Sequence, residues 1–300
     1  MDTLLEAMQA CWRHVEDNDR FIGSFHPALR DQLTTCFKTM HDMRANEETN
    51  EARKALVNAR NPLLFHESLK QILPGSLIFE EKQYPFLVLR ALMYGIERND
   101  SIIEGAVRFE ELGTQANGTW FLRATRTDCK VCATSTIQRK VYVDTMLTHS
   151  DVQEYKEANN GKWDPIKIFA AKQTMVTAQD SKCRACEGSV VHTITNTTYP
   201  EVVCIWWPTT NEPAQSGLSL SSKAKVTLSM GSAIYVMVAV FHHECNHWTV
   251  DTLDDEGAWF VMDNLTAHAA PVNTASEHKA NGVMYVRRNR QMKQLHGCDR

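Results

Sequence analysis

The sequence lacks the features that would place the protein in a membrane or outside the cell. No apolar run approaches the roughly 20 residues that a helix needs to span a bilayer. The first residues contain no basic region followed by an apolar block, so we expect no signal peptide. Internal repeats and low-complexity segments are also absent. We therefore expect an intracellular protein, in the cytoplasm, the nucleus or both, with no membrane partner.

An excess of positive charge is missing as well. The 300 residues include 32 Lys and Arg against 36 Asp and Glu, a formal net charge of −4. This balance argues against the phosphate backbone of a nucleic acid as the partner. The one basic cluster, at residues 287–290, is explained more simply as a solvated tail. A hydrophobic fraction of 43% is ordinary for a globular protein, and the length suits one large domain or two small ones.

Helices are expected first in the chain and strands later. Helical spacing of apolar residues covers four early segments, residues 2–22, 27–44, 64–73 and 83–98. From residue 105 onwards, β-branched and aromatic residues dominate short runs separated by Gly, Asn and Pro. The expected strands are residues 118–124, 135–145, 189–195, 201–207, 225–228, 235–241, 247–253, 258–263 and 283–287, with one later helix at 164–172. This order, without regular alternation, predicts an α+β fold.

Four cysteines have the spacing of a metal site. The total of nine is odd, so a complete disulfide framework is not expected. Two Cys-x-x-Cys pairs, Cys129 with Cys132 and Cys183 with Cys186, are separated by fifty residues. Each pair suits a tight turn at the tip of a hairpin, and two such turns can supply the four thiolates of a structural zinc site. Redox-active or idle thiols are the alternatives. The long separation implies that both hairpins belong to one larger sheet.

A candidate catalytic base lies in residues 238–263, where an apolar strand gives way to a histidine-rich segment. The acidic turn at residues 254–257 is a good hairpin connector, so the hairpin can bring His247 beside Asp263. A carboxylate that faces an imidazole holds one tautomer and stabilises its cation, as a general base requires. A nucleophile is missing from this stretch.

Two other interpretations of the histidine-rich segment stay open. His243, Cys245 and His247 alternate, so an extended strand would place them on one face, where a second metal ion could bind. The set is crowded and has no spaced fourth ligand, which argues against such a site. The histidines can equally be ordinary surface or core residues. Cys245 is a poor nucleophile candidate, because it is two residues from His247 on the same strand and leaves no cleft between them.

Several stretches together resemble the ubiquitin-specific protease family, papain-like cysteine proteases that cleave ubiquitin from proteins. Asn246-His247-Trp248 and residues 259–264 are similar to the family's Gly-His-Tyr box and the Trp-x-x-Phe-Asp-Asp box that follows it. The other similar stretches are residues 83–96 (the helix Gln-Asp-Ala-x-Glu-Phe-Leu, in a degraded form), residues 199–205 (the strand Leu-Pro-x-Val-Leu) and residues 279–287 (the terminal strand Ala-Tyr-x-Leu-x-Tyr). The two cysteine pairs fall where the family's fingers carry zinc, so the resemblance covers nearly the whole chain.

The resemblance implies a single domain over residues 1–300 with a papain-like α+β fold. A helical thumb would take residues 1–104, β-strand fingers with the zinc site and some palm strands would take residues 105–200, and a β-sheet palm with the catalytic His and Asp would take residues 201–300. The implied activity is thiol-dependent hydrolysis of isopeptide bonds at the C-terminus of ubiquitin. The implied partner is ubiquitin or a ubiquitinated protein, with no nucleic acid and no membrane.

The same resemblance implies roles for individual residues. His247 would be the general base and Asp263 would orient it. Gln83, Trp248 and Asn264 would support the active site or ubiquitin binding. A structural Zn²⁺ would be held by the four paired cysteines, Cys129, Cys132, Cys183 and Cys186.

The departures from the family concern the nucleophile. The family's opening box, Asn-Thr-Cys followed by Phe or Tyr, carries the catalytic cysteine. Residues 2–8 here resemble only the part after that cysteine, so the nucleophile would fall just before Met1 and the chain alone would be inactive. Tyr84 and Leu87 also replace acidic residues of the family's helix. These departures favour an alternative, a pseudoenzyme that binds ubiquitin or acts as a scaffold.

A third hypothesis, a zinc-ribbon nucleic-acid binder, would need a basic face with interleaved aromatics.

Cys11 is a weak substitute for the missing nucleophile. It lies in the middle of an expected helix, with only His14 nearby and no source of an oxyanion hole. Together with Cys36 and Cys204, it is expected to pack in the core.

Overall fold

The computed structural model describes residues 2–25, 27–44, 85, 88–89, 92, 106–108, 121–142, 145–161, 163–172, 174–196, 200–207, 227–230, 233–244, 247–262, 270–272 and 280–288. The helix expected at residues 64–73 lies outside them. Of the helix expected at 83–98, the four described residues are helical. Within these ranges, no helix is long and apolar enough to cross a membrane.

The N-terminal segment forms a helical layer of α1 (Asp2–His14), α2 (Asn18–Gly23), the short 3₁₀ helix η1 (Pro27–Leu29) and α3 (Arg30–Arg44). The prediction of one helix over residues 2–22 is wrong, because the helix is interrupted after His14. Asp17 explains the break: its carboxylate accepts a hydrogen bond of 2.8 Å from the Arg20 N–H and caps a new helix.

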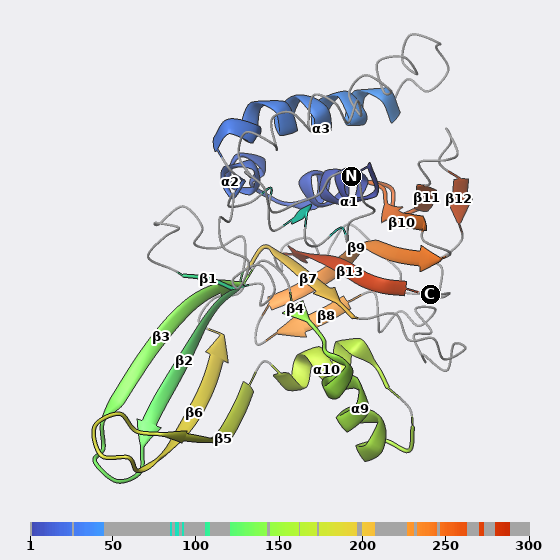
Figure 1. Cartoon of the computed structure of the whole chain (residues 1–300). Helices are drawn as coiled ribbons and strands as arrows, with labels where there is room; N and C mark the ends of the chain where they lie inside the picture. Colours follow the sequence, from blue (N-terminus) through green and yellow to red (C-terminus); the bar gives the residue numbers. More distant parts are fainter. Residues whose placement is uncertain are drawn as a thin grey trace.

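Among the described residues, the larger sheet has eight strands. Seven follow the order β12 (Ala270–Val272), β11 (Trp259–Met262), β10 (His247–Leu253), β9 (Ala233–Glu244), β13 (Ala280–Arg288), β7 (Val202–Trp206) and β4 (Thr145–Met146), and β8 (Thr227–Met230) also pairs with β9. Neighbours run antiparallel except β4 and β7. The long strand β9 is central and largely buried, because helices cover the sheet on both sides (Figure 1).

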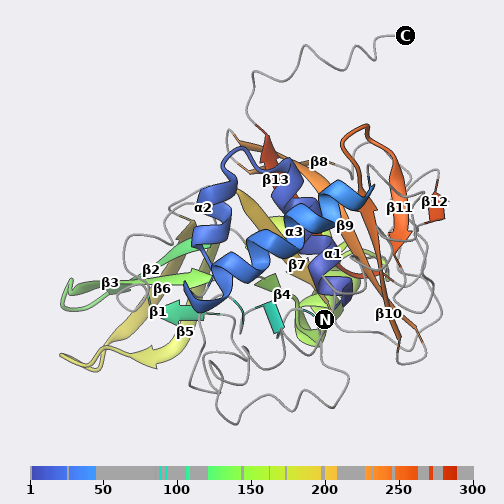
Figure 2. The ribbon, with the colours of Figure 1, turned by 90° about the horizontal axis from the view of Figure 1, so that it is seen from above.

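Helix α1 lies directly on this sheet, against β9, β10 and β13. Its apolar stripe, which includes Leu4, Met8 and Cys11, is at most 1% exposed. Seen from above, α3 crosses the same region farther from the sheet (Figure 2). Burial of this stripe between helix and sheet forms the main core and fixes where the first turn of α1 sits.

In the part of the chain that the structure describes, the smaller sheet has five antiparallel strands. Their order is β1 (Ala106–Arg108), β3 (Ser135–Tyr142), β2 (Phe121–Cys129), β6 (Ser189–Asn196) and β5 (Thr174–Lys182). It projects away from the larger sheet as a long, twisted ribbon (Figure 1). The β2–β3 turn and the β5–β6 turn lie together at its far end. This arrangement confirms that the two cysteine hairpins belong to one sheet.

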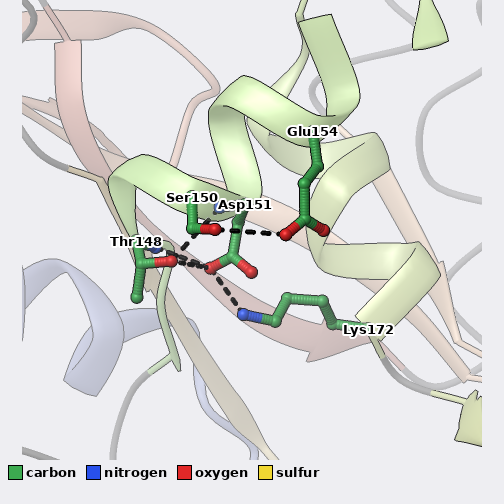
Figure 3. A network of polar contacts seen from close by, with 5 residues as sticks. All are labelled: Thr148, Ser150, Asp151, Glu154 and Lys172. Atoms are coloured by element: carbon green, nitrogen blue, oxygen red, sulfur yellow. Dashed lines mark hydrogen bonds and ion pairs between the residues drawn. The ribbon is translucent and has the colours of Figure 1, made fainter. Parts of the chain in front are cut away.

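Helices α9 (His149–Ala158) and α10 (Pro165–Lys172) lie on one face of the larger sheet, and α1 lies on the other face (Figure 1). The sequence pattern predicts α10 but not α9. Thr148 and Asp151 form a capping box at the start of α9, and Lys172 at the end of α10 makes a 2.6 Å ion pair with Asp151 (Figure 3). Burial raises the pKa of Asp151, but the bonds from Lys172 and Thr148 outweigh it and hold that pKa below its usual value.

Candidate metal centre and candidate active site

The four paired cysteines converge at the tip of the smaller sheet. Their Sγ atoms all lie within 4.8 Å of one another. Cys129 Sγ is 3.4 Å from Cys186 Sγ, and Cys132 Sγ is 3.7 Å from Cys183 Sγ. Four thiolates around zinc at about 2.3 Å are about 3.8 Å apart in a regular tetrahedron. The geometry therefore fits one small metal ion of the kind predicted from the sequence spacing.

The two cysteine turns have the same backbone design. In each, the N–H of the first cysteine donates across the turn, from Cys129 to Thr134 O at 2.9 Å and from Cys183 to Gly188 O at 2.8 Å. In each, the residue after the second cysteine is left-handed, with φ of 56° at both Ala133 and Glu187. Such turns direct both thiols of a pair inward, so two of them facing each other make a closed four-sulfur site.

The polar contacts of Cys129 and Cys132 favour the thiolate form that a metal requires. The backbone N–H groups of Cys132 and Val131 donate to Cys129 Sγ and lower the pKa of Cys129. The Thr134 hydroxyl, 2.9 Å from Cys132 Sγ, lowers the pKa of Cys132 to about 6. At Cys186 the backbone N–H of Gly188 acts in the same direction, but the neighbouring sulfurs of Cys132 and Cys129 outweigh it and raise the pKa of Cys186 to about 12. Soft thiolates in a closed set suit a structural ion with no open coordination position.

The second candidate site is the start of β10. His247 is the first residue of this strand, half-buried and paired in register with Glu244 of β9. Trp248 stacks on His243, with ring centroids 4.4 Å apart and planes inclined by 27°. The Thr3 hydroxyl, in the first turn of α1, donates to Trp248 O at 3.1 Å. The N-terminus of α1 is therefore next to the residue that follows His247.

Several residues predicted for this site lie outside the described residues. These are Gln83, Cys245, Asp263 and Asn264. The described pairing of β10 with β11 ends at Val250 and Met262, and Asp263 comes next in the sequence. The pairing of His247 with Asp263 stays a prediction.

The other end of α1 is also attached to β10. Arg13 Nη2 donates to Leu253 O at 2.8 Å, and His14 Nε2 lies 3.2 Å from the same oxygen. Arg13 also approaches Asp255, in the turn after β10, at 3.7 Å. Burial lowers the pKa of His14. His14 is therefore engaged at the far end of α1 and has a structural role.

Cys11 does not have the environment of a nucleophile. Its side chain is 1% exposed, its Sγ is 3.6 Å from Met284 Sδ, and burial strongly raises the pKa of its thiol. A reactive cysteine needs access and a nearby positive charge or helix N-terminus. The core position agrees with the sequence expectation.

Sequence reasoning missed a buried histidine–carboxylate pair in the larger sheet. His242 Nε2 of β9 lies 3.1 Å from Asp251 Oδ2 of β10, and the two side chains are 8% and 1% exposed. The strand register places His242 opposite Thr249, two residues before Asp251, so the pair bridges the strands diagonally. Polar residues among apolar ones in both strands were the available signal, but only the register shows that they meet.

No protein-family profile matches the sequence, and no curated protein sequence matches it either. Solved structures do match. The chain is similar to the SAGA deubiquitinase module of Ubp8, Sgf11, Sus1 and Sgf73 bound to monoubiquitin, with a TM-score of 0.53 and 10% identity over 96% of this chain and 67% of that chain. A second structure of that module, with a shortened Sgf11, gives a TM-score of 0.51 and 11% identity over the same shares. The chain thus has a mixed helix and sheet fold similar to that of a ubiquitin-specific protease domain.

Proposed function

We propose that this domain binds ubiquitin and that, joined to a cysteine just upstream of Met1, it hydrolyses isopeptide bonds at the C-terminus of ubiquitin. The proposal is supported above all by the contact between Thr3 and Trp248. This contact holds the first turn of α1 beside the residue that follows His247. A thiol just before α1 would have both a helix N-terminus and an imidazole close by, the two features that lower a cysteine pKa.

The proposed chemistry follows from these positions. His247 takes the proton of the thiol, and the thiolate attacks the carbonyl of ubiquitin's C-terminal glycine. His247 then gives the proton to the leaving amine, and water hydrolyses the thioester that remains. Asp263 would orient His247, while Gln83, Trp248 and Asn264 would support the site or bind ubiquitin.

Zinc would have a separate, structural part in this proposal. Cys129, Cys132, Cys183 and Cys186 would hold one Zn²⁺, which would lock the tips of the two hairpins together. The ribbon that they stiffen would then grip the globular body of ubiquitin. Metal analysis of the purified chain should give one equivalent of zinc per folded molecule, and clearly less would contradict this part.

Ubiquitin binding is the first experiment. Titration of ¹⁵N-labelled ubiquitin with the 300-residue chain should shift a contiguous set of ubiquitin resonances. His149→Ala, an exposed change on α9, is the matched control and should bind as the wild type does. Unchanged ubiquitin spectra at millimolar protein would refute the proposal.

Hydrolysis is the second experiment. We expect the 300-residue chain to leave a ubiquitin–fluorophore substrate intact. A chain that begins with the upstream cysteine should cleave it, and His247→Ala should abolish that cleavage while His149→Ala should not. Cleavage by the 300-residue chain that disappears in Cys11→Ala would overturn the placing of the nucleophile.

The alternative is a pseudoenzyme on the same fold that binds ubiquitin without cleaving it. One observation favours it: within the described residues, the cysteines outside the metal cluster are Cys11, Cys36 and Cys204, and all three are buried. The reading frame upstream of Met1 separates the two hypotheses. An in-frame cysteine followed by Phe or Tyr supports the enzyme, whereas an immediate stop codon supports the pseudoenzyme.

A further inference from the structure

Strand β13 contains a bulge next to the candidate active site. Ala280 pairs with His242 and Gly282 pairs with Phe241, so Asn281 is the extra residue between them. Its side chain is almost fully buried, at 5% exposed. Bulges occur often near active sites, where they redirect a side chain out of the regular pleat.

Asn281 uses both of its oxygens to connect neighbouring strands. Its side-chain Oδ1 accepts a 3.1 Å hydrogen bond from the backbone N–H of His243 in β9. Its backbone oxygen accepts a 2.9 Å bond from the N–H of Trp207, just after β7. The amide side chain thus supplies the acceptor for the N–H of half-buried His243 beside the bulge. A fully buried N–H without an acceptor costs about 1–3 kcal/mol, and a half-buried one costs less.

The contacts continue from His243 to the start of α1. His243 and Trp248 are direct cross-strand partners, and their rings stack at 4.4 Å. Trp248 O accepts the Thr3 hydroxyl, and Thr3 is 6% exposed. His247 precedes Trp248 by one peptide bond. Whatever fixes the indole and the carbonyl of Trp248 therefore limits the backbone freedom of His247.

We propose that Asn281 and His243 are positioning residues, which act through Trp248 to hold the His247 ring in one orientation and the N-terminus of α1 beside it. This inference rests on the proposed function, since orientation of an imidazole matters for a base that serves a thiol at α1. The contacts themselves can be measured without ubiquitin.

The test is the side-chain conformation of His247 in the 300-residue chain. Histidine-labelled, deuterated protein gives the Hα–Hβ couplings of His247, which show whether its ring holds one rotamer or averages over several. Asn281→Ala removes the acceptor of the His243 N–H, and Trp248→Leu removes the stack. Trp248→Phe keeps an aromatic partner for His243, and Asn159→Ala, at the exposed C-cap that follows α9, is the matched control.

We expect one rotamer of His247 in the wild type, Trp248→Phe and Asn159→Ala, and averaged couplings in Asn281→Ala and Trp248→Leu. The double variant Asn281→Ala/Trp248→Leu should be no more averaged than the worse single variant, because the two residues act in series. A fixed His247 ring in Asn281→Ala would overturn the proposal. So would equal averaging in Trp248→Phe and Trp248→Leu.

Two further measurements keep the outcomes distinct. Thermal unfolding identifies a variant that has lost its fold, and if Asn281→Ala does so, the Trp248→Leu and Trp248→Phe pair decides the question. Ubiquitin titration of the wild type runs in parallel. A wild type that ignores ubiquitin while the variants release His247 would refute the proposed function and leave the positioning contacts established.

Discussion

Docking of the two cysteine turns depends on the small size of Gly188. A Cβ at this position would lie 2.5 Å from Val131 Cγ2 and 2.8 Å from Val131 Cβ, and 3.2 Å from Cys186 Sγ. The φ of Gly188 is outside the left-handed region, so the obstacle to a side chain is steric. Val131 is 70% exposed, and its Cγ2 can rotate away. Its Cβ cannot, so Gly188→Ala must push the two turns apart.

The expected cost is that of overpacking by one methyl group, about 1–3 kcal/mol. Because the strain arises only when the turns are docked around the metal, it should appear as about 5-fold to 140-fold weaker zinc binding. The assay is competition for zinc between the folded chain and a chromophoric chelator at fixed pH. Gly23→Ala is the matched control, since a Cβ at Gly23 meets nothing within 4 Å.

Compensating changes at Val131 make this prediction stringent. Val131→Ala removes Cγ2 but keeps the Cβ, so the double variant with Gly188→Ala should recover only part of the affinity. Val131→Gly removes both atoms and should restore affinity close to that of Val131→Gly alone. Zinc binding by Gly188→Ala that equals that of the wild type would show that the turns are not packed as described.

Three further changes test other parts of the fold. Arg13→Ala should lower the free energy of unfolding by about 1–3 kcal/mol, because a buried charge-assisted bond to Leu253 O is lost. Asp255→Ala removes only the exposed partner of Arg13 and should lower it by under about 1 kcal/mol. Chemical denaturation of the two variants measures the difference. Asp151 has a lowered pKa in the folded protein, so its contribution to stability is present at neutral pH and declines as the pH falls below about 4. The difference in free energy of unfolding between the wild type and Asp151→Ala should therefore shrink over that range. Cys11→Ala should cost about 1 kcal/mol in stability and leave ubiquitin binding unchanged, as measured by the ubiquitin titration.

Many of the elements that sequence reasoning found have strong apolar patterns, although the polar strand expected at residues 135–145 also forms, as β3. The strands expected at residues 201–207, 235–241, 247–253 and 258–263 all form, as β7, β9, β10 and β11. Strands β7 and β9 are largely buried, β10 is buried over its last four residues, and β11 is buried at both ends, so their apolar runs report their surroundings. Helix α10 was found for the same reason.

Two of the elements that it missed, β5 and α9, lack a strong apolar pattern and are held partly by tertiary contacts. Strand β5 (Thr174–Lys182) is rich in polar residues and lies at the edge of the smaller sheet, where pairing with β6 and the cysteine turn hold it in place. Helix α9 was overlooked although the Thr148–Asp151 capping box was visible in the sequence. Its ion pair to Lys172 at the end of α10 is a tertiary contact, which the local sequence does not specify.

The candidate sites also differ in whether the sequence alone could predict them. The cysteine cluster was predictable because Cys-x-x-Cys spacing itself specifies a turn, and four sulfurs need only one sheet to meet. The buried pair of His242 and Asp251 was not predictable, because a diagonal contact between strands depends on the strand register, which the sequence does not specify. The role of Asn281 depends on a bulge, which shifts the pairing by one residue and has no local signature here.

The position of α1 is fixed at both ends, and this explains how a polar site can be built at the start of β10, a strand inside an apolar sheet. Thr3 contacts Trp248 and Arg13 contacts Leu253. Ten helical residues rise about 15 Å, and five strand residues span about 17 Å, so the two intervals match and α1 runs along β10 in the same direction. Sliding the helix would break the polar contacts at both ends together. The distance between the first turn of α1 and His247 is therefore set by the helix and strand as rigid units, and the four-cysteine cluster at the far end of the smaller sheet has no part in setting it.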